Sequence, residues 1–175
     1  MKPLQYLFPG WYALPMGLAG LALAWHRAVP LMGDGAGAVA WAVGALAAAV
    51  YAALLVATAL RGWKFPAAWA EDRRHPVRHT FIATLPIATL LVATVGVATL
   101  GPHPALAALW WLGSLGQLFV TVWVLGRWWG RLAWPSVTPA LFIPIVGNVL
   151  APLAGVPLGQ ADWAAAQFGI GLLFW

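Results

Sequence analysis

The chain lacks cysteine and has very little charge. None of its 175 residues is cysteine, and only 7% are charged, whereas 63% are hydrophobic. Without cysteine there are no disulfides and no thiolate metal sites to consider. Soluble domains contain roughly 25% charged and 45–50% apolar residues. The composition therefore excludes an ordinary soluble domain and predicts an integral membrane protein.

Long apolar runs indicate how the chain crosses the bilayer. A hydrocarbon core about 30 Å thick needs about 20 apolar helical residues, with every backbone amide paired internally. The runs are too uniformly apolar for the alternating strands of a barrel, so we expect an all-α membrane protein. Six segments are readable, with a loop expected over 26–37: 8–25, 38–60, 80–100, 105–126, 139–156 and 162–175.

The two ends of the chain give separate expectations. Lys2 and the apolar run after it resemble a signal sequence, but Pro9, Gly10 and Pro15 interrupt that run. A first transmembrane helix is therefore favoured. The sixth segment is too short to cross a bilayer, which predicts a single transmembrane domain over 1–175 that stops inside its sixth helix.

Acidic residues are scarce, and the placement of the basic ones indicates orientation. The chain has 9 Lys and Arg against 4 Asp and Glu. The basic residues gather in the loops after the second and fourth segments, so they indicate cytoplasmic loops rather than nucleic-acid binding. This predicts a cytoplasmic N-terminus. The loop residues are Arg61, Lys64, Arg73, Arg74, Arg78, Arg127 and Arg131.

Proline separates odd segments from even ones. Pro15, Pro86 and Pro144 lie well inside segments one, three and five, whereas segments two and four have none in theirs. Proline lacks an amide hydrogen, leaves a carbonyl unpaired and bends a helix. Such bends belong where neighbouring helices or water reach them. We expect helical hairpins with kinked inner helices and straight outer ones, although ordinary close packing of small residues is an alternative.

The apolar parts of the complete spans contain no charged residue, which argues against a proton-relay pump. Hydroxyls, an amide, glycines and freed carbonyls instead suit an anion pathway. Two roles remain open for Asn148: its side chain faces the anion, or it donates hydrogen bonds to carbonyls that Pro144 leaves unpaired. The expected pore-lining residues are Pro15, Gly17, Thr84, Pro86, Thr89, Pro144, Gly147 and Asn148.

Enzymatic chemistry has little support in the sequence. We find no nucleophile motif and no phosphate loop, and we expect no catalytic residue, cofactor or metal. His75 and His79 have helical spacing, but a loop-to-helix junction explains them better than a metal site. Arg73, Arg74 and Arg78 fit the cytoplasmic side, with anionic lipid as the sharper alternative.

Four stretches resemble a known family. YALPMGLAGLALAW, HPVRHTFIATLPIAT, WWLGSLGQLFVTVWVLGRWW and PALFIPIVGNVLAPLAG occur in an order and spacing similar to the tellurite-resistance and C4-dicarboxylate transporter family, which includes the plant slow-type anion channels. The resemblance covers essentially the whole chain.

The resemblance implies ten transmembrane helices in five hairpins, of which this chain holds the N-terminal portion. Odd helices would surround an anion pore, and each protomer of a homotrimer in the inner (plasma) membrane would have its own pore. Implied substrates are C4-dicarboxylates, tellurite, sulfite and small inorganic anions. The alternatives are a membrane-embedded enzyme, disfavoured above, and a structural or assembly subunit without transport of its own.

Overall fold

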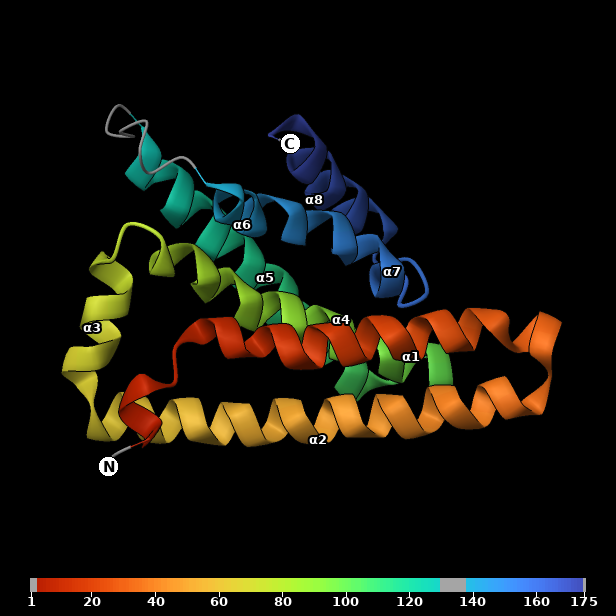
Figure 1. Ribbon diagram of the computed structural model, residues 1–175. Coiled ribbons are helices and arrows are strands. Elements are labelled where there is room, and N and C mark those ends of the chain that lie inside the picture. Colours follow the sequence, from red (N-terminus) through yellow and green to blue (C-terminus); the bar gives the residue numbers. More distant parts are fainter. Residues whose placement is uncertain (1–2, 130–137, 175) are drawn as a thin grey trace.

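The computed structural model describes residues 3–129 and 138–174, which form helices and turns without a β-strand in those ranges. Lys2, Arg131 and Trp175 lie outside the described residues. Two short 3₁₀ helices, η1 (Pro3–Tyr6) and η2 (Pro9–Tyr12), precede the first long helix. Figure 1 shows the helices arranged as consecutive hairpins.

The first hairpin pairs α1 (Ala13–Met32) with α2 (Asp34–Lys64). The loop expected over 26–37 is wrong, because both helices continue until Gly33 alone joins them, with φ at 73°. That left-handed conformation costs glycine little. Hydropathy marks where the apolar run stops, whereas a helix can continue into polar residues as long as its backbone pairs.

A short helix that we did not expect, α3 (Pro66–Arg74), lies across one end of the bundle (Figure 1). A buried ion pair fixes it to α2. Arg61 Nη2 lies 2.7 Å from Asp72 Oδ2, and their side chains are only 3% and 0% exposed. Arg78 Nη1 also reaches Asp72 Oδ1, at 3.0 Å. The polar stretch is therefore a folded cap rather than an open loop.

The second hairpin consists of η3 (Arg78–Ala83), α4 (Thr84–Leu100) and α5 (Pro104–Trp128). Helix α4 packs against α1, α2, α5 and α7, which places it at the centre. Of its apolar span, 67% is buried, against 28% for α2 and 33% for α5. The third segment is thus an inner helix, as the proline pattern predicted.

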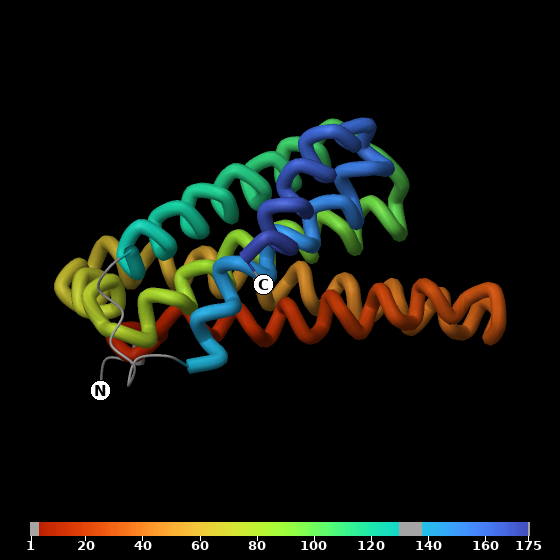
Figure 2. The backbone as a smooth tube through the Cα atoms, turned by 90° about the horizontal axis from the view of Figure 1, so that it is seen from above, coloured from red at the N-terminus to blue at the C-terminus, as the bar shows by residue number. Residues whose placement is uncertain are grey.

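The third hairpin begins with the fifth segment, residues 139–155. This segment is broken into η5 (Pro139–Phe142), α6 (Ile143–Val146), η6 (Gly147–Leu150) and α7 (Ala151–Gly155). Helix α8 (Ala161–Leu173) returns along it. Figure 2 shows α7 and α8 beside the turn between α4 and α5.

The contrast between odd and even segments is confirmed in the helix geometry. Pro15, Pro86 and Pro144 each lie in the first turn of an α-helix that directly follows a 3₁₀ segment. Helices α2 and α5 run without such a break. The prolines therefore act at a change of helix type, where the missing amide hydrogen is tolerated, rather than in mid-helix.

Three helical spans are long and apolar enough to cross a membrane: 34–64, 78–100 and 104–128, with a shorter apolar one at 139–155. His26 and Arg27 interrupt the apolar character of α1. The end of the bundle that holds α3 and the C-terminus of α5 contains most of the described basic residues, and we call it the basic end.

Candidate functional site

The odd segments begin next to one another at the basic end. Thr84 Oγ1, in the first turn of α4, donates to the Pro9 carbonyl at 2.7 Å and to the Phe81 carbonyl at 2.6 Å. The first contact joins segment one directly to segment three. Segment η3 also packs against η2 and α6. The three proline-bearing segments therefore begin in contact with one another at the basic end of the bundle.

The carbonyl oxygen of Pro144 accepts hydrogen bonds from three side chains. Gln117 Nε2 and Thr121 Oγ1, both on α5, lie 2.6 and 2.7 Å from it, and Asn148 Nδ2 lies 3.2 Å from it. A peptide carbonyl buried in an apolar bundle needs such partners when the helix around it changes type. The irregular fifth segment is thus held by polar side chains of its neighbour.

Asn148 extends this arrangement to α8. Its amide also donates to Thr121 Oγ1 at 2.8 Å and to the Ile145 carbonyl at 3.0 Å, while its carbonyl oxygen accepts from Gln167 Nε2 at 3.1 Å. The side chain is 0% exposed. We call the connected set the amide network: Ser114, Gln117, Thr121, Asn148, Trp163 and Gln167.

The other expected pore residues lie at separate packing contacts. Thr89 Oγ1 lies 2.6 Å from Tyr51 of α2, and its hydroxyl also donates to the Leu85 carbonyl at 2.9 Å. Pro86 packs near Gly116 of α5. Gly147 lies so close to Gln117 and Ile87 that a Cβ would not fit. Each contact joins an odd segment to a neighbouring helix.

Segment one differs, because its expected residues are less enclosed. Pro15 is buried, but Gly17 is exposed, with nothing within 4 Å of a Cβ placed there. The eight residues therefore do not surround one common cavity in this structure. That they line an anion path stays a prediction.

At the end opposite the basic end, a cavity of about 600 Å³ lies among the three odd segments. We call it the interhelical cavity. Helix α1 contributes His26 and Arg27, α4 contributes Thr94 and Val97, and the fifth segment contributes Leu153. No acidic residue lines it, and Arg27 has no ion-pair partner among the residues that the structure describes.

His26 and Arg27 were missed as site residues because we assigned them to a loop. Both lie within α1, three and four residues after Leu23, which lines the same cavity and shares their side of the helix. The lack of a helix breaker between the apolar run and Pro30 is the sequence signal that could have found them. A basic group among apolar walls attracts an anion without enclosing it in opposite charge.

In the described part of the chain, no three His, Cys, Asp or Glu side chains lie close enough together to bind a metal ion. His75 instead caps a junction. Its Nδ1 accepts from the backbone amides of Val77 and Arg78, at 3.2 and 3.1 Å, where α3 gives way to η3.

Comparison with known proteins identifies a family of membrane proteins. The family model described as voltage-dependent anion channel, SLAC1, matches residues 6–175. A tellurite resistance protein TehA homolog of Haemophilus influenzae is 31% identical over 170 residues, which is 95% of this chain and 51% of that protein. The chain thus spans about half the length of the relative that it matches. A helical membrane fold whose odd segments change from 3₁₀ to α-helix at a proline, together with a family match over residues 6–175, places the chain in the voltage-dependent anion channel family.

Proposed function

We propose that the protein passes anions down their gradient along a path between the odd segments. The interhelical cavity is the observation that supports this best. Residues of all three proline-bearing segments line it, and its basic side chains face no carboxylate. Because the local potential is positive and the walls are mostly apolar, an anion is attracted but not held tightly.

The finer features of the proposal rest on the family resemblance of the sequence and on the placement of its basic residues. We infer that the substrate belongs to the C4-dicarboxylates, tellurite, sulfite or small inorganic anions. We also propose an inner-membrane location, a cytoplasmic N-terminus and a homotrimer in which each protomer conducts. The positive charge at the basic end supports this orientation.

Flux into liposomes tests the proposal. The full-length protein is reconstituted, and uptake of chloride, nitrate, malate and sulfite is compared with that of potassium. We expect at least one anion to pass at a rate above that of protein-free liposomes, with potassium excluded. If none of the four anions moves, the transport proposal is wrong and a structural or assembly role takes its place.

A further inference from the structure

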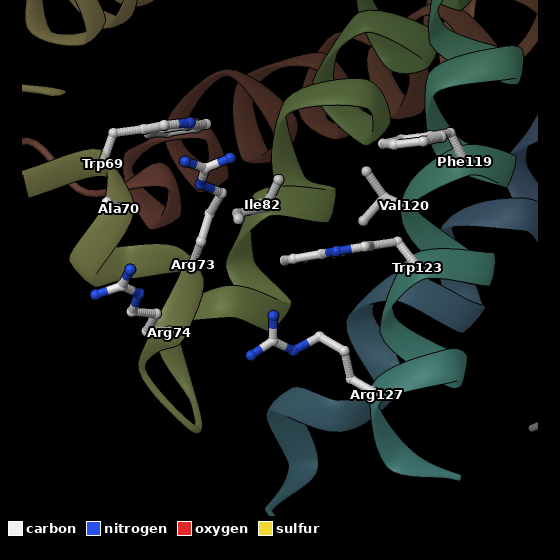
Figure 3. A pocket seen from close by; sticks show the side chains of 9 residues that line it. All are labelled: Trp69, Ala70, Arg73, Arg74, Ile82, Phe119, Val120, Trp123 and Arg127. Atoms are coloured by element: carbon white, nitrogen blue, oxygen red, sulfur yellow. The ribbon is translucent and has the colours of Figure 1, made fainter. Parts of the chain in front are cut away.

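A second cavity, of about 460 Å³, lies at the basic end between α3 and α5 (Figure 3). One side consists of Trp69 on α3, and the other of Phe119 and Trp123 on α5. Arg73 and Arg127 reach into the space between the two helices, and Arg74 lies at its edge. The cavity therefore combines aromatic walls with three guanidinium groups.

The apolar part of this cavity continues onto the outer surface of the bundle. Phe119 is 71% exposed, on an apolar span long enough to cross a membrane. Trp123 lies one turn further toward the basic end, and the guanidinium of Arg127 is 5.1 Å from its ring centroid. Aromatic side chains followed by a basic one mark the level at which hydrocarbon meets headgroups.

The three arginines of the cavity have no counter-charge among the residues that the structure describes. Both acidic residues of α3 are already occupied, because Asp72 pairs with Arg61 and Arg78, and Glu71 pairs with Arg78. Across the described ranges, no ion pair involves Arg73, Arg74 or Arg127. Two guanidinium groups that reach into one space, with a third arginine at its edge, are complementary to a phosphate.

We propose that this cavity binds one anionic phospholipid of the adjacent leaflet. Its phosphate lies among Arg73, Arg74 and Arg127, and its acyl chains follow Phe119 and Trp123. The volume falls within the range of sites for small molecules, and basic pockets between membrane helices bind anionic headgroups. A free phosphate would use the arginines but would leave the aromatic walls uncovered. The inference does not depend on transport.

The test measures lipid binding to the full-length protein in detergent. Short-chain phosphatidylglycerol is titrated, and the melting temperature and the lipid retained in native mass spectrometry are recorded. We expect phosphatidylglycerol to raise the melting temperature more than phosphatidylcholine of the same chain length. Glycerophosphate and inorganic phosphate, which lack acyl chains, are expected to give little shift.

Charge-matched variants assign the binding to the cavity. Arg73→Gln and Arg127→Gln are expected to weaken phosphatidylglycerol binding several-fold. Lys64→Gln removes one charge from an exposed residue at the same end but outside the cavity, so it should bind like the wild type. Equal binding by all three variants would overturn the proposal, because the lipid would then bind outside this cavity. An equal response to inorganic phosphate would also overturn it, in favour of a soluble anion site.

Discussion

Asn148 is the residue for which the sequence left two roles open. Its amide contacts the carbonyls of Pro144 and Ile145, and its oxygen accepts from Gln167. It therefore satisfies backbone oxygens of the irregular fifth segment and joins that segment to α8. The Ala140 carbonyl, four residues before Pro144, accepts from the Ile143 backbone amide. Asn148 therefore stabilises the turn that follows the proline rather than the one before it.

Replacing Asn148 with Leu tests this structural role. The variant loses its hydrogen bonds to Thr121 and Gln167, and bonds between membrane helices contribute about 0.6 kcal/mol each on average. We expect the free energy of unfolding in detergent to fall by roughly 1–3 kcal/mol, because the partner amide of Gln167 loses an acceptor in a buried site.

Gln160→Leu is the control for this change, because its side chain makes no capping hydrogen bond at the start of α8. It should unfold like the wild type. If Asn148→Leu keeps full stability but loses anion flux, the side chain serves the anion path instead of the fold.

Asp72 is a buried acid whose carboxylate pairs with two arginines, Arg61 and Arg78. Asp72→Asn leaves the Arg61 charge buried without a counter-charge, and removing one partner of such a pair costs about 3–5 kcal/mol. We expect a markedly lower melting temperature and proteolysis near α3. Glu71→Gln, at an exposed neighbouring position, should have little effect. Similar melting for the two variants would show that the buried pair does not hold α3.

At the scale of the elements, the proline spacing was sufficient to separate odd segments from even ones. Pro86 and Pro144 mark the changes from 3₁₀ to α-helix because proline removes the same backbone donor wherever it occurs. The sequence did not predict α3, since nine mostly small and charged residues show no apolar stripe. Its position depends on the ion pair of Asp72 with Arg61, which no local pattern encodes.

Packing of α8 on the fifth segment depends on Gly171. A Cβ at this position would lie 2.7 Å from Val149 Cγ1 and 3.1 Å from the Val149 nitrogen, which belongs to the backbone and cannot move alone. We expect Gly171→Ala to lower the free energy of unfolding by about 1–3 kcal/mol through overpacking.

Gly169→Ala is the matched control, because nothing lies within 4 Å of a Cβ there and the residue belongs to the same helix. Alanine favours a helix over glycine by about 1 kcal/mol, so this variant should be at least as stable as the wild type. Equal loss of stability in both variants would contradict the contact between α8 and η6.

For the whole molecule, composition together with the length and uniformity of the apolar runs was enough to predict an all-α membrane protein. The interhelical cavity was not predictable in the same way, since it joins residues of α1, α4 and the fifth segment through their packing. Arg27 became a site residue only when α1 proved to extend to Met32. The polarity of Gln117 and Thr121 was visible in the sequence, but their shared acceptor, the Pro144 carbonyl, was not.

The orientation proposed for the chain is directly testable, because the sequence has no cysteine. Single cysteines are introduced at Lys64, which is exposed at the basic end, and at Leu31, which is 90% exposed at the opposite end. A membrane-impermeant maleimide added outside intact spheroplasts should label position 31 and not position 64. The reverse labelling would place the basic end outside and the N-terminus with it.

Flux through variants of Arg27 tests whether anions pass between the odd segments through the interhelical cavity. The full-length protein is reconstituted in liposomes as wild type, Arg27→Gln and Arg27→Lys, with the orientation of insertion measured for each. We expect Arg27→Gln to lower anion flux several-fold at low ionic strength and Arg27→Lys, which keeps the charge, to stay close to the wild type. Equal flux through Arg27→Gln and the wild type would show that anions do not pass through this cavity.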